Sequence, residues 1–361
     1  MILDLSAPVE ELARHLVDVE SVSGNEGELA DAVELALRGA EHLTLIREGN
    51  VIVARTELAR AERVVIAGHL DTVPVTGNLP ARIEDGVLWG RGAVDMKGGL
   101  AVLLSLAAAE KEPSRDVTWI VYDNEEVDEA RNGLGHLFRT RPDLLVADFA
   151  ILAEPTSARI EGGCNGTLRI EARVPGVAAH SARAWRGTNA IHGAAPVLAK
   201  LAAYEPRTVE VDGLTYREGL NAVGIAGGIA GNVIPDSCVV TINYRFAPDK
   251  SAAQAEHHVR DILSTAGVHG LEVTVVDRGE GCRPGLNSPL AQSLALAVSA
   301  TGAGEPRAKQ GWTDVARFGA AGIPAVNYGP GDPELAHSDG ERVTIAEIRQ
   351  VREGLAAWLA T

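Results

Sequence analysis

Three short apolar runs in this sequence each end in a histidine or an acid. RVVIAGH (63–69), VTWIVYD (117–123) and ADFAILAE (147–154) have the length and the Val- and Ile-rich composition of buried strands. Helical patterns such as GGLAVLLSLAAAEK (98–111) separate them. This alternation is typical of an α/β layer with a largely parallel sheet, in which the strands finish side by side. The polar residues that follow the strands are therefore expected to surround one site.

The hydrophobic pattern of the sequence changes near residue 166. The runs TLRIEARVPG (167–176), VTINYRF (240–246) and LEVTVVD (271–277) alternate between apolar and polar residues, as antiparallel strands do, and helical patterns lie between them. After residue 284 the sequence again shows the helix and strand patterns typical of an α/β domain. We therefore expect an α+β domain (166–283) inserted into an α/β domain formed by residues 1–165 and 284–361.

The charge balance restricts the partners. With 33 basic and 49 acidic side chains, the formal charge of −16 argues against nucleic acid or an anionic membrane as a partner. The three cysteines, Cys164, Cys238 and Cys282, indicate neither a disulfide framework nor a thiolate metal cluster. The first 20 residues lack the pattern of a signal peptide, and no long uncharged apolar stretch is present. We expect a cytoplasmic protein that acts on a small molecule.

The segment DNEEVDE (123–129) holds five carboxylates at the end of a strand. Like charges this close raise one another's pKa values, and a divalent cation removes the conflict. Histidine and carboxylate ligands without a thiolate favour Zn²⁺, Co²⁺ or Mn²⁺. Each motif alone has a simpler explanation, a solvated helix start for the acidic run or a capped loop for the histidine. Their recurrence at several strand ends favours a metal site.

Five motifs occur in the order found in a known family. GHLDTVP (68–74), GRGAVDMKGG (90–99), YDNEE (122–126), AEPT (153–156) and AHSDGE (336–341) resemble those of the M20 family of two-metal aminoacylases and carboxypeptidases. The resemblance covers nearly the whole chain. It implies a metallopeptidase-like α/β catalytic domain, with a mixed, largely parallel sheet flanked by helices. It also implies that the inserted α+β domain is ferredoxin-like and serves as a dimerisation and lid domain.

The resemblance implies a role for each residue of these motifs. Two divalent metal ions are expected, with Zn²⁺ preferred and Co²⁺ or Mn²⁺ as alternatives, on the ligands His69, Asp95, Glu126, Glu154 and His337. Asp95 would bridge the ions, with His69 and Glu154 on one and Glu126 and His337 on the other. Asp71 would fix the tautomer of His69. Glu125 would act as the general base that takes a proton from the attacking water and passes it to the departing amine.

The inserted segment carries its own motifs. In AHSA (179–182), His180 resembles the family histidine that reaches a partner subunit's site and binds the substrate carbonyl oxygen, which requires a homodimer. Asn232 and Arg245 resemble residues that hold a substrate carboxylate, a task that suits the planar guanidinium. Simpler alternatives are a polar junction for His180 and a surface ion pair for Arg245. The remaining predicted substrate-binding residues are Arg183, Thr313, Arg317, Asn327 and Gly329.

The substrate is the least constrained part of the resemblance. The stretches NGLG (132–135), GCNGTLR (163–169) and GWTDVARFGAAGIPAVN (311–327) resemble most the family members that hydrolyse N-succinyl-L,L-diaminopimelate to succinate and L,L-diaminopimelate. Many of these carry RRGS where this chain has CNGT (164–167). Either another arginine compensates, or the acyl group is not succinyl.

Other functions remain as alternatives. Within the family these are an acetylornithine deacetylase and a dipeptidase or carboxypeptidase. Outside it are a non-catalytic metal-binding homologue and a metal-dependent phosphoesterase. The homologue is disfavoured because no expected ligand is missing and Glu125 is present. The phosphoesterase is disfavoured because the sequence has no Gly-rich phosphate-binding loop.

Overall fold

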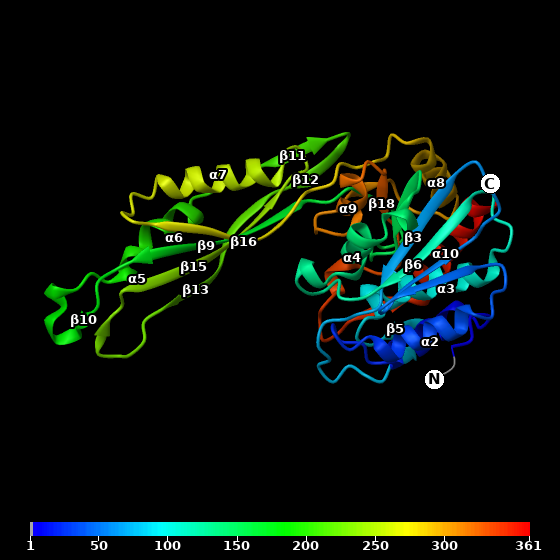
Figure 1. Ribbon diagram of the computed structural model, residues 1–361, viewed down its shortest axis with the longest axis horizontal. Helices are drawn as coiled ribbons and strands as arrows, with labels where there is room; N and C mark the ends of the chain where they lie inside the picture. The colour runs from blue at the N-terminus through cyan, green and yellow to red at the C-terminus, as the bar shows by residue number, and fades with distance from the viewer. Residues whose placement is uncertain (1–2) are drawn as a thin grey trace. The chain divides into compact units, whose positions relative to one another are not determined.

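The three apolar runs form adjacent strands of one eight-stranded sheet (Figure 1). In the computed structural model, which describes residues 3–361, β3 (Arg63–His69) lies between β6 (Asp116–Tyr122) and β7 (Phe149–Leu152) and is parallel to both. The sheet order is β1-β2-β6-β3-β7-β18-β8-β17. The other strands are β1 (Thr44–Glu48), β2 (Val51–Arg55), β8 (Glu161–Gly162), β17 (Arg307–Ala308) and β18 (Ala325–Asn327). The predicted α/β fold with a mixed, largely parallel sheet is confirmed.

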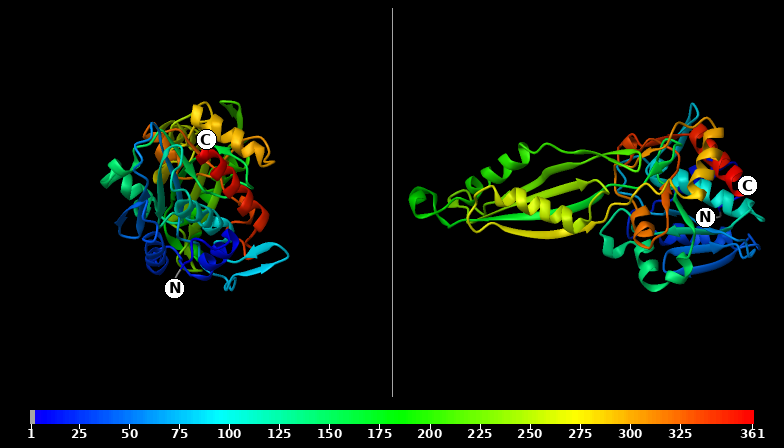
Figure 2. Two further views of the ribbon diagram at one scale, coloured as in Figure 1. Left: turned by 90° about the vertical axis from the view of Figure 1, so that its right-hand side faces the viewer. Right: turned by 90° about the horizontal axis from the view of Figure 1, so that it is seen from above.

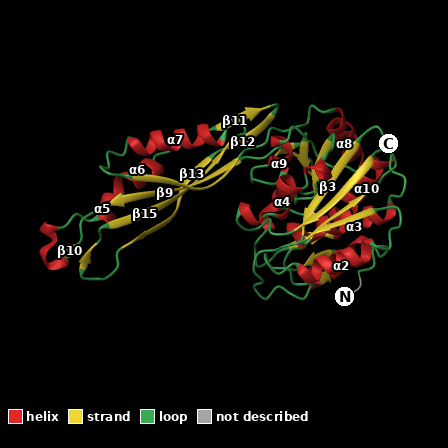
Figure 3. Ribbon diagram, viewed as in Figure 1, coloured by secondary structure: helices red, strands yellow, loops and turns green. Residues whose placement is uncertain are grey.

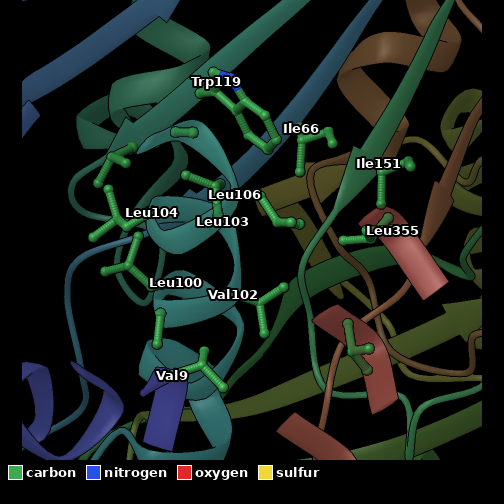
Figure 4. Close-up of a cluster of buried hydrophobic side chains, with 14 of the residues drawn as sticks. Val9, Ile66, Leu100, Val102, Leu103, Leu104, Leu106, Trp119, Ile151 and Leu355 are labelled. Atoms are coloured by element: carbon green, nitrogen blue, oxygen red, sulfur yellow. The ribbon is translucent and has the colours of Figure 1, made fainter. Parts of the chain in front are cut away.

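The central strands of this sheet are buried on both faces. Ile66, Trp119 and Ile151 belong to a core cluster with side chains of α1 (Val9–Asp18), α3 (Gly98–Ala109), α8 (Pro289–Ala300) and α10 (Ile345–Ala360). Figure 4 shows Leu103 and Leu106 of α3 and Leu355 of α10 among these sheet residues. Val65 and Ile120 point to the opposite face of the sheet and are also buried. Burial on both faces explains why these strands are apolar throughout. Figure 2 shows α8 and α10 packed side by side.

The first residues of α3 come very close to the end of β7. A Cβ atom on Gly99 would lie 2.1 Å from the carbonyl oxygen of Ala153, so only glycine allows this approach. The glycine pair at the start of α3 therefore brings the loop before the helix against the residues that follow β7. The remaining α-helices of this part are α2 (Gly27–Leu37), α4 (Gly133–Thr140) and α9 (Val315–Ala320). Shorter helical turns are Ala93–Lys97, Glu129–Arg131, Pro142–Leu145 and Pro333–Leu335.

A small second sheet joins two distant loops. β5 (Val87–Trp89) pairs with β4 (Arg82–Glu84) on one side and with β19 (Arg342–Thr344) on the other, in an antiparallel register that sets Trp89 opposite Arg342. The Gly90 N–H donates to the carbonyl oxygen of Glu341 at 3.1 Å. This pairing places the GRGAVD segment next to the AHSDGE segment, although about 250 residues separate them in the chain.

The inserted part has a four-stranded antiparallel sheet of order β13-β15-β9-β16 (Figure 3). The strands are β9 (Gly166–Pro175), β13 (Gly219–Gly227), β15 (Ser237–Phe246) and β16 (Glu272–Gly279). Helices α5 (Ala190–Gly193) and α6 (Ala195–Ala202) follow β9, and α7 (Ala252–Ser264) precedes β16. This βαββαβ order is that of the ferredoxin-like fold. Smaller elements are β10 (Ala179–His180), Ser181–Arg186, β11 (Thr208–Val211), β12 (Leu214–Arg217) and β14 (Val233–Ile234).

The chain divides into two units, and one boundary differs from the sequence prediction. The first unit contains the chain up to Gly162 together with Pro284–Arg307 and Arg317–Thr361, and the inserted unit contains Gly163–Arg283 and Ala308–Ala316. The prediction assigned Ala308–Ala316 to the catalytic domain. The segment packs instead with the inserted unit, because Asn165 Nδ2 donates to the Gln310 carbonyl oxygen and the Trp312 indole N–H donates to that of Glu280. Among residues 3–361, no helix has the length and apolar character that a membrane span requires.

Candidate metal centre and active site

Four of the five predicted metal ligands converge in the first unit. His69 Nε2 lies 3.1 Å from Asp95 Oδ1, and His337 Nε2 lies 3.3 Å from Asp95 Oδ2. His337 Nε2 also lies 2.8 Å from Glu126 Oε1. One ligand atom each from His69, Asp95 and Glu126 lie within 4.8 Å of one another. Asp95 therefore stands between the two histidines, with one carboxylate oxygen directed towards each.

These four side chains come from different segments at the carboxyl edge of the sheet. His69 is the last residue of β3, and Glu126 lies in the loop after β6. Asp95 lies in the turn that precedes α3, and His337 lies in the loop before β19 with a φ angle of 62°. A left-handed conformation is uncommon for a residue with a Cβ atom, and histidine is one of the residue types that adopt it more readily. Three of the four side chains therefore come from segments outside the strands, and His69 comes from the end of β3.

Glu154, the fifth predicted ligand, leaves the sheet beside His69. In the parallel pairing of β3 with β7, Ala67 lies opposite Leu152, and the Ala153 N–H donates to the Ala67 carbonyl oxygen at 2.9 Å. Two residues further along each strand are His69 and Glu154, both buried. The register thus places Glu154 at the edge where the other four meet.

Asp71 organises the backbone around His69. Its carboxylate accepts hydrogen bonds from the N–H groups of Glu125 and Glu126, at 2.9 and 3.0 Å, and from the Ser23 hydroxyl at 2.7 Å. The Nδ1 atom of His69 lies 2.9 Å from the backbone carbonyl oxygen of Asp71 and 3.5 Å from the Oδ1 atom of the Asp71 carboxylate. An N–H on Nδ1 leaves Nε2, which faces Asp95, free to bind a cation. Asp71 therefore orients both the histidine and the loop of the two glutamates.

The ionisation of the cluster shows how strongly its charges interact. Burial disfavours the charged form of His69, but hydrogen bonds to Asp71 and Asp95 outweigh burial and hold the imidazole pKa well above its usual value. Hydrogen bonds to Asp95 and Glu126 raise the pKa of His337 to about 10. Burial raises the pKa of Glu126. The cluster of carboxylates therefore favours a positive charge at this position.

Glu125 lies next to the ligand Glu126, in the same loop after β6. Its backbone N–H is held by Asp71, and its side chain is partly exposed. Arg317 of α9 contacts this loop, because its Nη1 atom lies 3.0 Å from Glu129 Oε1. A carboxylate that is oriented by its backbone and open on one side suits the proton-transfer role predicted for Glu125.

Two further predicted residues lie at the end of β18, the strand beside β7, and just after it. The Asn327 Nδ2 atom at the end of β18 donates to the Glu161 carbonyl oxygen at 3.4 Å, and the side chain is buried. Gly329 packs against the backbone of Glu154, since a Cβ atom there would lie 2.4 Å from the Glu154 carbonyl oxygen. Gly329 therefore supports the ligand Glu154, and its predicted contact with substrate stays a prediction.

Three predicted residues gather at one end of the inserted unit. His180 pairs with Val233, and the Ser181 N–H donates to the Asn232 carbonyl oxygen at 2.9 Å. Arg183 follows in the exposed turn Ser181–Arg186. The His180 Nδ1 atom accepts the Ala182 N–H at 3.0 Å. The neutral imidazole therefore carries its proton on Nε2, which makes that atom a hydrogen-bond donor.

Arg245 and Thr313 lie at the other end of the inserted sheet. Arg245 pairs with Thr167 on β9, whereas the opposite end of β15, at Ser237, pairs with Pro175. Arg245 follows Ser237 by eight positions, which corresponds to roughly 26 Å at about 3.3 Å per residue. Thr313 is buried next to Cys164, close to the same end as Arg245. Asn232 and Arg245 therefore lie near opposite ends of β15 within one subunit, and their contacts with a substrate carboxylate stay a prediction.

Comparison with known proteins identifies the family. The model of Peptidase family M20/M25/M40 matches residues 65–361. The chain belongs to this family. As an M20 member it is a hydrolase of amide bonds.

Two relatives match almost the entire chain. A Mycobacterium tuberculosis protein, provisionally named succinyl-diaminopimelate desuccinylase DapE, is 54% identical over 99% of both chains. The succinyl-diaminopimelate desuccinylase of Corynebacterium glutamicum is 46% identical over 99% of this chain and 98% of its own.

Solved structures share the M20 fold at low sequence identity. A tripeptidase of Staphylococcus aureus gives a TM-score of 0.81 at 20% identity, over 100% of this chain and 99% of its own. A dinuclear metal binding peptidase of the M20 family from Bacillus subtilis gives a TM-score of 0.73 at 16% identity, over 99% of this chain and 98% of its own. These similarities support the fold alone.

The donor set of this M20 chain fits a divalent cation. Two imidazole nitrogens face the oxygens of Asp95 and Glu126, and none of the free cysteines, Cys164, Cys238 and Cys282, belongs to the described group of candidate ligands. Nitrogen and oxygen donors without sulfur suit Zn²⁺, Co²⁺ or Mn²⁺. A cation would also supply positive charge between these carboxylates. Carbonyl and carboxylate groups of Asp71 fix the orientation of His69, as is usual around metal ligands.

Several residues that shape this M20 site were not among the predicted ones. Arg91 and Glu341 form a buried ion pair at 2.8 Å beside Asp95. Ser23 bonds to Asp71, and the Met96 sulfur lies 3.3 Å from the His69 backbone nitrogen. Arg91, Met96 and Glu341 lie inside the motifs GRGAVDMKGG and AHSDGE, so the sequence did mark these segments as part of the site. Ser23 lies outside them, and no pattern in the sequence marks it.

Proposed function

We propose that this M20 chain hydrolyses N-succinyl-L,L-diaminopimelate to succinate and L,L-diaminopimelate. The observation that carries the proposal is the near full-length identity of 54% and 46% to proteins named succinyl-diaminopimelate desuccinylase, in a chain whose candidate ligands converge. The reaction breaks the amide bond between the succinyl group and the amino group, and water supplies the new carboxylate oxygen. A cytoplasmic location fits this proposal and stays a prediction.

The proposed centre contains two divalent ions, with Zn²⁺ preferred over Co²⁺ and Mn²⁺. Asp95 supports this number, because its two carboxylate oxygens face different histidines. His69 and Glu154 would bind one ion, Glu126 and His337 the other, and Asp95 both. When bound, such ions polarise the scissile carbonyl group and lower the pKa of a water molecule. The M20 peptidase of B. subtilis, which shares the fold, is itself a dinuclear metal binding protein.

Proton transfer is assigned to Glu125. In the proposed mechanism its carboxylate takes a proton from the attacking water and then delivers it to the departing amine, so that the amine leaves in neutral form. Asp71 supports this assignment, because its carboxylate accepts the Glu125 N–H and so holds the backbone from which the Glu125 side chain projects. The same carboxylate orients His69, so one buried residue aligns both the base and a ligand.

We further propose a homodimer in which His180 completes the partner's site. His180 is exposed, and its Nε2 donor suits the negative oxygen that forms as water attacks the carbonyl. The edge strand β13 offers a surface for association, because Val223 and Ile225 expose 61% and 54% of their area. A dimer also resolves the separation of Asn232 from Arg245, since two subunits can present them to one substrate.

The substrate has three carboxylates, which require local positive charge in an acidic protein. Arg183 and Arg245 are the proposed contacts, and Arg317 is less suited because it already pairs with Glu129. The CNGT segment supplies no cation: Cys164 and Asn165 are buried, and the Asn165 amide donates to two carbonyl oxygens. Recognition of the succinyl carboxylate therefore falls to arginines outside this segment. Thr313, Asn327 and Gly329 stay proposed as parts of the pocket.

The decisive experiment compares three substrates on one preparation. The zinc-loaded enzyme is assayed with N-succinyl-L,L-diaminopimelate, N-acetylornithine and a dipeptide, and the Glu125→Gln variant, purified in the same way, controls for contaminating hydrolases. We expect kcat/KM for the succinyl substrate to exceed the other two by at least about 100-fold. A preference for either alternative would overturn the substrate assignment but leave the hydrolase intact. No turnover of any amide would remove the catalytic proposal itself.

A further inference from the structure

A buried ion pair lies behind the ligand Asp95. Arg91 Nη1 and Glu341 Oε2 are 2.8 Å apart, and each residue exposes 2% of its area. The two residues are 250 positions apart in the chain. Because both side chains are almost completely buried, the pair requires a different explanation from that of a substrate contact.

Glu341 holds the backbone from which the Asp95 side chain projects. Its second carboxylate oxygen, Oε1, accepts the N–H groups of Val94 at 3.1 Å and Asp95 at 3.2 Å. A carboxylate that accepts backbone N–H groups makes stronger bonds than a neutral acceptor does. The bonds therefore restrict where the two oxygens of Asp95 can lie.

Arg91 connects the same pair to two other loops. Its Nε donates to the Pro74 carbonyl oxygen at 3.1 Å, in the loop that follows His69. Its Nη1 donates to the Ser338 carbonyl oxygen at 3.2 Å, one residue after His337. The rigid guanidinium thus spans the loops of His69, Asp95 and His337.

Maintaining the fold alone does not require this pair. The β5–β19 register and the bond from Gly90 to the Glu341 carbonyl oxygen already join the two segments. Burying two charges is costly, and apolar replacements of buried ion pairs are often as stable. What apolar side chains cannot supply is the directed set of bonds to the backbone beside Asp95 and His337.

We propose that Arg91 and Glu341 are positioning residues that set the affinity for the ion bound by Asp95, Glu126 and His337. The inference rests on the proposed two-metal function. Asp95 and His337 depend on the pair through their own or adjacent backbone atoms, whereas His69 is also oriented by Asp71. Loss of the pair should therefore weaken one ion more than the other.

The test measures ion binding directly. Zinc is titrated into the metal-free full-length protein in competition with a chromophoric chelator, and the cobalt-loaded protein gives an absorption spectrum that reports ligand geometry. Glu341→Gln keeps the shape of the side chain but presents an amide to Arg91, and Glu341→Ala removes all its bonds. Glu334→Gln is the matched control, since Glu334 is exposed, lies in the same loop and carries the same charge.

We expect graded effects on the ion bound by Asp95, Glu126 and His337, which we take to be the weaker-binding one because the His337 side chain is 51% exposed whereas His69 is buried. Glu341→Gln should weaken the weaker-binding zinc about 10-fold and Glu341→Ala about 100-fold, the range usual for residues that orient metal ligands. The tighter zinc and the control variant should change less than about threefold. The cobalt spectrum of the Gln variant should differ from wild type at two equivalents of cobalt and match it at one.

Each other outcome decides the question. If folded Glu341→Ala binds both ions as wild type does, the pair is structural only and the inference is overturned. If the Glu341 variants do not fold, Arg91→Lys decides by the same titration, because lysine keeps the charge but loses the bonds to Pro74 and Ser338. An unchanged second affinity in Arg91→Lys would again overturn the inference. If wild type binds fewer than two ions, the proposed function fails instead.

Discussion

Replacing Asp71 by asparagine tests the organisation of the site at a residue that contacts no predicted substrate. Both carboxylate oxygens accept a backbone N–H, from Glu125 on one side and Glu126 on the other. The asparagine amide has only one oxygen. Whichever way it is turned, its NH₂ group faces a donor, so at least one buried N–H loses its acceptor.

The magnitude follows from these contacts. A buried donor without a partner costs about 1–3 kcal/mol, and losing the charge on the remaining bonds costs about 1 kcal/mol more. We expect the free energy of unfolding of the metal-free protein to fall by about 2–4 kcal/mol. At about 2–4 °C per kcal/mol, the unfolding midpoint should drop by roughly 5–15 °C. Zinc affinity should fall about 10- to 100-fold, because His69 is no longer held in one orientation.

The assays are thermal unfolding in chelator and zinc titration against a competing dye. Ser23→Ala is the matched control, because it removes one bond to Asp71 but leaves the carboxylate charged. Ser23→Ala should lower the free energy of unfolding by about 1 kcal/mol and leave the zinc affinity within about threefold of the wild-type value. An Asp71→Asn protein that unfolds within about 2 °C of wild type and binds zinc equally well would refute the reasoning.

Other parts of the molecule lead to four more expected outcomes. Glu125→Gln should retain bound metal but lose about 10²–10⁴-fold in kcat, since an amide cannot carry the proton; normal turnover would remove it from the mechanism. His180→Ala should lower kcat about 10²–10³-fold, and mixing it with Glu125→Gln subunits should restore activity if the histidine acts across the dimer. Gly329→Ala should weaken metal binding, because its Cβ would lie 2.3 Å from a backbone oxygen, whereas Gly311→Ala, in open space, should not. At Asp116, hydrogen bonds outweigh burial and lower the carboxyl pKa, so its stabilisation is present at neutral pH and is lost as the pH falls below about 4. The unfolding midpoints of Asp116→Asn and wild type should therefore converge in acid; a constant difference would contradict this.

The sequence was most informative where chemistry and strand position coincide. His69, Asp123 and Glu154 follow apolar runs, and these runs are the adjacent parallel strands β3, β6 and β7. A strand that is buried on both faces consists almost entirely of apolar residues, and such a run is easy to recognise in a sequence. Both the strand and the edge of the sheet at which it ends could therefore be predicted. The loop ligands Asp95 and His337 required the family motifs, because no periodicity identifies a loop that folds over a sheet.

Contacts between distant segments could not be predicted in this way. Arg91 and Glu341 meet only because β5 pairs with β19, and three-residue strands leave almost no pattern in a sequence. The same limit explains the substrate residues: Asn232 and Arg245 occupy neighbouring motifs, yet β15 runs nearly its full length between them.

The return of Ala308–Ala316 to the inserted unit has a consequence for protein engineering. An inserted unit exchanged between relatives as the continuous piece Gly163–Arg283 would leave this short companion segment behind, with Trp312 facing a foreign Gly279. A chimera that transplants both pieces together would keep the indole in its native packing. Exchange of the inserted unit in this architecture therefore requires two blocks of sequence rather than one.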